Sequence, residues 1–244
     1  TQAAARKIRR RLTVFAAARY NVDEEQIRFL PNRILAGNQE IPWRTLIKEA
    51  YMGRVSLSAT GFYETPAREK DPLRAGGKAH RYHAYGAACS EVIIDVLTGE
   101  HRVVRVDILH DVGRSINPAI DYGQVEGGFI QGVGWLTSEE VIWDESGKLC
   151  THAPSTYKIP VASDRPVDFR MNLVDWSANR VESVHGSKAV GEPPLPLAVS
   201  VFCALTDAIA GAGDYRVFPD LDAPATPERI LKAVEVVRQR SAAA

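Results

Sequence analysis

The chain has 244 residues, of which 45% are apolar and 25% charged, an ordinary globular composition that excludes disorder, collagen or a coiled coil as its overall description. Its 30 basic and 30 acidic residues cancel, whereas a nucleic-acid-binding surface normally brings a basic excess, so no nucleic acid is expected as a partner. The longest uncharged apolar stretch, residues 193–206, is shorter than the ~20 residues that a membrane helix needs, so no membrane contact is expected.

Three cysteines, Cys89, Cys150 and Cys203, stand far apart in the sequence. Their odd number and the lack of a Cys-x-x-Cys spacing argue against both a disulfide framework and a cysteine metal site. We expect each to be a small buried thiol in a reducing compartment.

The amino-terminal part predicts two helices joined by a loop. Ile8, Leu12 and Phe15 recur at helical spacing and form one apolar face. Residues 31–38 carry Pro, Gly and Asn and predict the loop. A second helix is expected to begin near Pro42, whose fixed φ suits a first helical turn.

The middle of the chain changes its period from helix to strand. Residues 61–77 are polar and interrupted by proline and glycine, which predicts a long loop. Apolar and polar residues then alternate over 92–96 and again over 104–108, with a turn at 97–100. This pattern predicts a β-hairpin with one solvated face.

Further strands are expected around residues 141–143 and 169–174, and a final helix at Thr226–Pro227, where threonine can cap and proline can start the helix. No strand–helix–strand alternation is evident. The predicted fold class is therefore α+β, mostly antiparallel sheet with packed helices. Residues 1–244 are taken as a portion of one domain, and no internal boundary is predicted.

Residues 117–135 combine helical spacing with an unusual set of glycines. Gly123, Gly127, Gly128, Gly132 and Gly134 each cost up to ~1 kcal/mol relative to alanine in a helix interior. A sequence that keeps such glycines usually needs close backbone approach. Either another helix or a ligand could be the approaching object.

A single carboxylate is the main candidate for chemistry. Glu192 precedes Pro193 and Pro194, so its backbone is restricted, and an apolar run at 197–209 predicts a buried helix just behind it. A charge held rigidly near a core is costly unless it is paired or used, and general base catalysis is one such use. Capping of the following helix, or an ion pair with Lys188, is the structural alternative.

Other titratable groups have weaker claims. Glu139 and Glu140 invite a comparison with paired hydrolase carboxylates, but neighbours in an extended segment point apart, which favours solvated acids. His80 and His83 are spaced like metal ligands but lack a third ligand, so no metal site is predicted. No phosphate-binding loop, nucleophile elbow or dinucleotide fingerprint is present.

Taken together, six strings of the chain resemble the molybdenum-binding part of the xanthine dehydrogenases, within the molybdenum hydroxylase family. They occur in the family's order, at residues 54–63, 85–91, 111–121, 123–127, 154–160 and 187–195.

The resemblance implies a molybdenum ion that is held by a pterin dithiolene rather than by protein side chains. Glu192 matches the family glutamate that takes a proton from a molybdenum-bound oxygen, which then attacks a purine carbon. Gln124 matches the glutamine that hydrogen-bonds the pterin. The implied activity is hydroxylation of hypoxanthine or xanthine to urate in the cytoplasm, with electrons passing to Fe–S clusters, FAD and NAD elsewhere in the assembly.

The family's molybdenum subunit is much longer than this chain. We therefore expect a carboxy-terminal fragment whose partners are the upstream part of that subunit and an Fe–S/FAD subunit or domain. Alone, it is expected neither to bind the cofactor well nor to turn over. An aldehyde oxidase of the same family and a non-catalytic assembly or interaction module are the alternatives.

Overall fold

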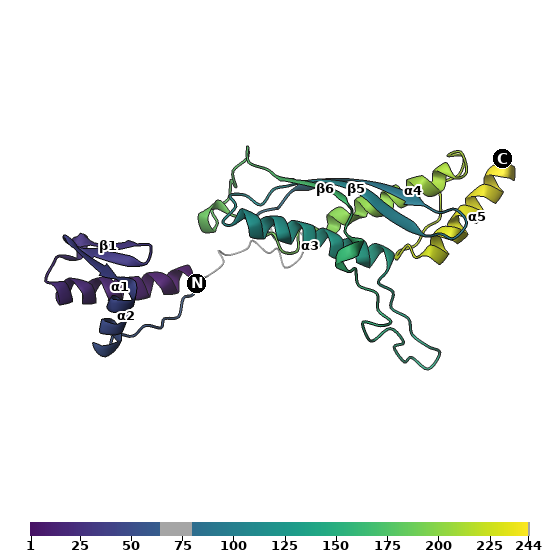
Figure 1. Ribbon diagram of the computed structural model, residues 1–244. Helices are drawn as coiled ribbons and strands as arrows, with labels where there is room; N and C mark the ends of the chain where they lie inside the picture. Colours follow the sequence, from purple (N-terminus) through teal and green to yellow (C-terminus); the bar gives the residue numbers. More distant parts are fainter. Residues whose placement is uncertain (64–79, 244) are drawn as a thin grey trace, which may run out of the picture. The chain divides into compact units, whose positions relative to one another are not determined.

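A computed structural model describes residues 1–63 and 80–243 of the chain (Figure 1). Its contacts divide the chain into two compact units, Thr1–Asp71 and Pro72–Ala244. The long loop predicted for residues 61–77 lies mostly outside the described residues.

The first unit packs two helices against a small sheet. Leu12 and Ala16 of the first helix, Ile34 of the sheet and Leu46 of the second helix are all buried, and they confirm both predicted helices. Its elements are α1 (Gln2–Tyr20), η1 (Glu24–Gln26), β1 (Ile27–Leu30), β2 (Arg33–Ala36), β3 (Gln39–Pro42) and α2 (Trp43–Met52).

The loop predicted between the two helices is wrong. Residues 27–42 form a three-stranded antiparallel sheet in the order β1-β2-β3. Asn32 and Gly37 adopt positive φ at its two tight turns, which are the positions that asparagine and glycine favour. Because each strand has only four residues, the turn formers dominate the sequence pattern.

The second unit carries a larger sheet with helices packed on it. Its elements are β4 (Gly86–Ile94), β5 (His101–His110), α3 (Pro118–Thr137), η2 (Ala162–Asp164), β6 (Asp168–Leu173), η3 (Val184–Gly186), η4 (Leu195–Ala198), α4 (Val199–Gly211) and α5 (Pro227–Ala243).

One face of this sheet is covered and the other is solvated. α3 packs on β6 through the edge-to-face rings of Phe129 and Phe169, 5.7 Å apart, and α4 meets β4 where the Ser90 and Ser200 hydroxyls are 2.8 Å apart. Buried residues of β5, α3, α4 and α5 form the core. The exposed face carries charged side chains such as Arg105, which pairs with Asp107 at 2.7 Å.

The predicted hairpin with one solvated face is therefore confirmed, and it consists of β4 and β5. The pairing of β5 with β6 is parallel, and the connection between them contains α3. This is a strand–helix–strand crossover, an alternation that is not evident in the sequence. Parallel neighbours require such a crossover, and the choice of β6 as the neighbour of β5 depends on tertiary packing.

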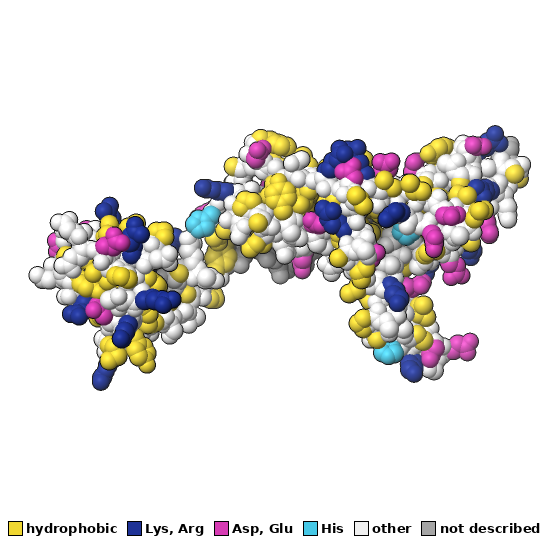
Figure 2. Space-filling model, viewed as in Figure 1, with side chains coloured by type: hydrophobic (Ala, Val, Ile, Leu, Met, Phe, Trp, Pro, Cys, Tyr) yellow, Lys and Arg dark blue, Asp and Glu magenta, His cyan; other side chains and the backbone are white. Residues whose placement is uncertain are grey.

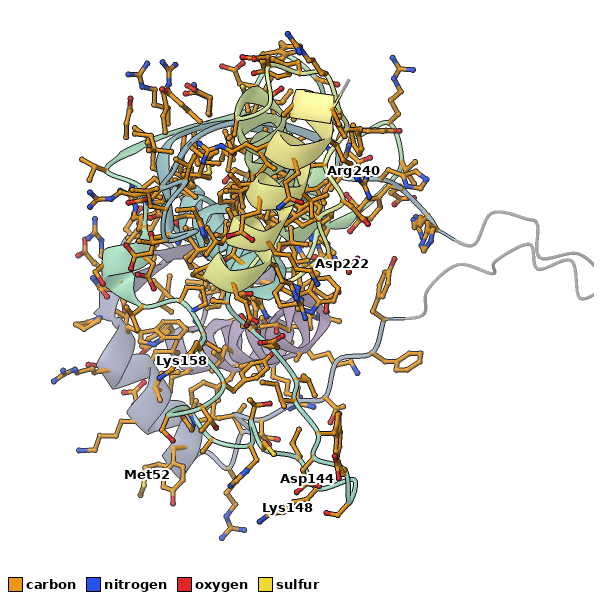
Figure 3. The ribbon with its side chains drawn as sticks, turned by 90° about the vertical axis from the view of Figure 1, so that its right-hand side faces the viewer. Met52, Asp144, Lys148, Lys158, Asp222 and Arg240 are labelled. Carbon is orange, nitrogen blue, oxygen red and sulfur yellow. The ribbon has the colours of Figure 1, made fainter. Side chains whose placement is uncertain are left out.

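The strand expected at residues 141–143 is absent from the described chain. Only an isolated bridge between Trp143 and Leu149 forms there. It belongs to an arm, residues 139–160, that projects from the end of α3 (Figure 1), with Asp144 and Lys148 near its tip (Figure 3).

The three cysteines are free but exposed, so their predicted burial is wrong. Cys89 faces the open side of β4, Cys203 lies on the outer face of α4, and Cys150 lies on the arm. Within residues 1–63 and 80–243, no helix is both long and apolar enough to cross a membrane.

Candidate functional site

The glycine-rich helix α3 forms as the spacing predicted, and it starts at Pro118. Three of its glycines face protein. A methyl group built on Gly132 would lie 2.4 Å from the carbonyl oxygen of Leu195, and one on Gly128 would lie 3.2 Å from Cβ of Pro194. Gly134 meets Pro160 equally closely. These glycines let segment 191–198 and the arm pack directly on the helix backbone.

The other two glycines face open space. A methyl group on Gly123 or Gly127 would meet nothing within 4 Å among the described residues. They lie one turn apart on α3, on the side that also carries the exposed Ile120 and Gln124. Contacts with the described residues therefore do not account for these two glycines, and the helix presents bare backbone beside an amide side chain.

Segment 191–192 lies next to this face. A methyl group built on Gly191 would lie 3.5 Å from Oε1 of Gln124. The fold thus places Gln124 beside Gly191, the residue that precedes Glu192, although the two sequence-predicted site residues are far apart along the chain.

The Glu192 side chain is exposed rather than desolvated. Its backbone carbonyl accepts a hydrogen bond from the amide of Leu195 at 3.1 Å. Among the described residues, no side chain is hydrogen-bonded to its carboxylate or paired with it. The alternative in which Lys188 neutralises it is wrong, because Lys188 pairs with Asp111. Capping is not observed either, since η4 begins after Pro194 without a side-chain cap.

The Asp111–Lys188 ion pair is a feature that sequence reasoning missed. Its side chains are only 9% and 7% exposed, respectively. Asp111 Oδ1 also accepts the amide of Gly113 at 2.8 Å, and the Lys188 ammonium lies 5.2 Å from the ring centre of Tyr85. Both residues stand within the strings that carry the family resemblance, which was the available signal.

His110 is the second missed residue. Its side chain is buried at the end of β5, and its Nδ1 has no hydrogen-bond partner within residues 1–63 and 80–243. Burial lowers the pKa of His110 below its ordinary value; the neighbouring Asp111 carboxylate opposes this shift, and the Lys188 ammonium adds to it.

The paired acids at the end of α3 do not form a hydrolase site. Glu139 accepts a hydrogen bond from the Tyr157 hydroxyl at 2.7 Å, and Glu140 pairs with Arg229 at 2.8 Å. Each carboxylate is half-buried and has its own structural partner, so they do not face a common substrate position.

The rings of His80 and His83 pack edge to face, with their centres 5.8 Å apart. In the part of the chain that the structure describes, no group of three His, Cys, Asp or Glu side chains could hold a metal ion. The residues near Gln124 instead suit a planar organic group, because bare backbone allows close approach and an amide can both donate and accept hydrogen bonds.

Residues 1–166 match the family model of the molybdopterin cofactor-binding domain, and the chain belongs to this family. Its relatives include "Xanthine dehydrogenase/oxidase" of Rattus norvegicus, 50% identical over 197 residues, which are 79% of this chain and 15% of the relative. "Xanthine dehydrogenase" of Dictyostelium discoideum is 45% identical over 212 residues, 84% of this chain and 16% of the relative. The chain thus spans only a small part of these relatives.

Solved structures confirm the α+β fold. Reconstituted CO dehydrogenase from Oligotropha carboxidovorans matches with a TM-score of 0.65 at 23% identity, covering 97% of this chain and 28% of that one. Quinoline 2-oxidoreductase from Pseudomonas putida 86 gives a TM-score of 0.64 at 27% identity, with 95% and 28% covered. Gln124 lies within the residues that match the family model, whereas Glu192 lies beyond them.

Proposed function

We propose that this chain is the part of a xanthine dehydrogenase-type molybdenum hydroxylase that presents Gln124 and Glu192 to the molybdenum–pterin group. The observation that carries the proposal is the bare α3 face at Gly123 and Gly127, with Gln124 and segment 191–192 side by side. The family model, which is that of a molybdopterin cofactor-binding domain, supports it.

Gln124 is the residue assigned to the pterin. Its side chain is exposed on α3, and the two neighbouring glycines leave room for a flat ring system to reach the amide. When bound, the molybdenum–pterin group supplies the two-electron oxidation and the oxygen used in hydroxylation. Gln124 then binds the pterin edge by hydrogen bonds, which fixes the orientation of the group relative to the 187–195 segment.

Glu192 is the residue assigned to proton transfer. A general base needs an available carboxylate at a fixed position, and the Glu192 carboxylate has no partner among the described residues. Pro194 is buried immediately behind it, and Gly128 lets α3 pack against that proline. The fold thus fixes the position of Glu192, and its carboxylate accepts the proton there.

The names of the relatives support xanthine as a substrate and an oxidoreductase activity. We extend the proposal to hypoxanthine as a second purine substrate and to the cytoplasm as the location. On this proposal, the upstream part of the molybdenum subunit completes the site, and Fe–S clusters, FAD and NAD in other parts of the assembly carry the electrons. The 244-residue chain by itself would not turn over, because it spans only 15% of the rat relative.

Glu192→Gln in the native protein tests the proposal. The substitution keeps the shape of the side chain but removes the proton acceptor, so purine oxidation should fall by about 10²–10⁴-fold while molybdenum content stays normal. Glu182→Gln, at an exposed glutamate of the same region, is the matched control and should leave turnover unchanged. Undiminished turnover of the Glu192 variant would overturn the assignment.

Two alternative functions can be distinguished from the proposed one by experiment. An aldehyde substrate would use the same two residues, so comparing turnover of xanthine with that of an aromatic aldehyde decides between them. A non-catalytic assembly module is favoured by the exposed apolar side chains of the arm, among them Trp143 and Ile159. A native protein that contains no molybdenum or pterin would exclude the catalytic proposal and leave the assembly module as the alternative.

A further inference from the structure

Just before Glu192, the backbone of residues 186–188 is hydrogen-bonded to residues 112–114, which follow the end of β5. The amide of Lys188 donates to the carbonyl of Val112 at 2.8 Å, and the amide of Arg114 donates to the carbonyl of Gly186 at 2.9 Å. Between them, Gly113 and Ser187 form an isolated antiparallel bridge. Two short stretches of backbone are therefore joined over three consecutive positions.

This junction depends on a close approach at Gly113. The residue has φ +63°, and a methyl group on it would lie 2.4 Å from the carbonyl oxygen of Gly186. Glycine is the residue that accepts both conditions. The two stretches are consequently in direct backbone contact, and residues 186–188 follow any movement of residues 112–114.

The Lys188 side chain reinforces this backbone contact. It crosses to Asp111, whose second carboxylate oxygen holds the amide of Gly113, and both side chains are more than nine-tenths buried. A buried pair adds little net stability, because desolvation offsets the attraction. It does select one arrangement, because moving either partner leaves a buried charge unpaired.

The residues between Lys188 and Glu192 transmit this arrangement. The amide of Ala189 donates to the Tyr82 hydroxyl at 3.1 Å, and Val190 packs against the core. Beyond Glu192, Pro194 is buried against α3. Glu192 therefore lies in a short segment that is held by contacts both before it, at Ala189 and Val190, and after it, at Pro194.

We propose that Lys188, through its buried ion pair with Asp111, is a positioning residue that fixes the place of Glu192. This role rests on the proposed function of Glu192. Lys188 is assigned no contact with substrate or cofactor. It acts on the backbone four residues upstream of the base, and a misplacement of about 1 Å at a reacting group can cost about 10²-fold in rate.

The test removes both charges together in the native protein, as Lys188→Met with Asp111→Asn. Removing both avoids an unpaired buried charge, and asparagine can still accept the Gly113 amide. Arg229→Met, which breaks the Glu140 pair elsewhere in the same unit, is the control. Hydrogen exchange at the amides of residues 188–192 is the first readout, because it does not depend on activity.

We expect exchange at these amides to rise at least about tenfold in the double variant, with α4 and α5 unchanged, and not to rise in the control. We also expect kcat to fall at least about tenfold with KM unchanged. In a Glu192→Gln background the same double substitution should cause no further loss, because both changes act on one proton transfer.

The outcomes separate the two proposals. If Glu192→Gln alone leaves turnover intact, the proposed function fails. If Glu192→Gln abolishes turnover but the Lys188/Asp111 double variant keeps normal exchange at residues 188–192, the positioning role is overturned. It is also overturned if the losses from the two changes multiply, since that indicates a general structural effect.

Discussion

At the scale of single residues, His110 shows how the fold changes a side chain that looks unremarkable in the sequence. It ends β5 next to Asp111, its ring is buried, and its Nδ1 has no partner in the described part of the chain. Burial disfavours the charged imidazolium, which is why its pKa falls below the ordinary value of 6.5. Burial also lowers the pKa of His101, at the other end of the same strand.

These lowered pKa values predict how stability depends on pH. Below about pH 6.5 the unfolded chain binds protons that the folded chain does not, so the free energy of unfolding should fall as the pH drops from about 6.5 through the lower folded pKa. Urea unfolding at pH 7.5 and 5.5 measures the difference. His110→Gln should reduce this difference in the free energy of unfolding, and His101 should account for the part that remains. An unaltered difference in the variant would contradict the buried neutral state of His110.

The Asp111–Lys188 pair shows what single-residue reasoning from sequence misses. Glu192 and Gln124 were identified because each stands in a distinctive local string. The ion pair joins residues 77 positions apart, and charge complementarity alone could not choose it over the nearer Lys188–Glu192 pairing. The exposure of Glu192 could not be foreseen either, because it depends on how η4 and α3 pack.

At the scale of elements, α3 combines two kinds of glycine that the sequence cannot tell apart. Gly128, Gly132 and Gly134 face protein, whereas Gly123 and Gly127 face open space. Both explanations considered for these glycines, close packing within the protein and room for a ligand, therefore apply at different positions. The first follows from the contacts, and the second is part of the proposed function.

Two alanine substitutions separate these explanations. Gly132→Ala should lower the free energy of unfolding by about 1–3 kcal/mol, because its methyl group would meet backbone. Gly127→Ala should raise it by up to ~1 kcal/mol through helix propensity, yet reduce the pterin content of the native protein. Denaturant unfolding and pterin analysis measure the two effects. A full pterin content in the Gly127 variant would argue against this face as the binding surface.

The secondary structure was predictable where a pattern runs through a whole element. Helices α1, α2 and α5 and the β4–β5 hairpin follow from apolar periodicity and terminal signals. The sheet β1-β2-β3 was missed because four-residue strands carry too little periodicity. The parallel neighbour of β5 was missed because partner choice depends on tertiary packing.

At the scale of the whole molecule, the chain is a small part of the relatives that it matches, and its surface is consistent with that. The projecting arm carries hydrophobic side chains in contact with solvent (Figure 2). Among them, Trp143 is 60% exposed and Ile159 is 57% exposed. Such exposed apolar groups mark surfaces that bind other protein. Under the proposed function, we therefore expect the arm to contact the upstream part of the molybdenum subunit or another part of the assembly.

The central claim is that this chain belongs to a working molybdenum–pterin enzyme, and the most direct measurement is the molybdenum and pterin content of the purified native protein. We predict equal amounts of metal and pterin, close to one of each per chain, with pterin reduced in a Gln124→Ala variant. A native protein that contains neither metal nor pterin would contradict the account.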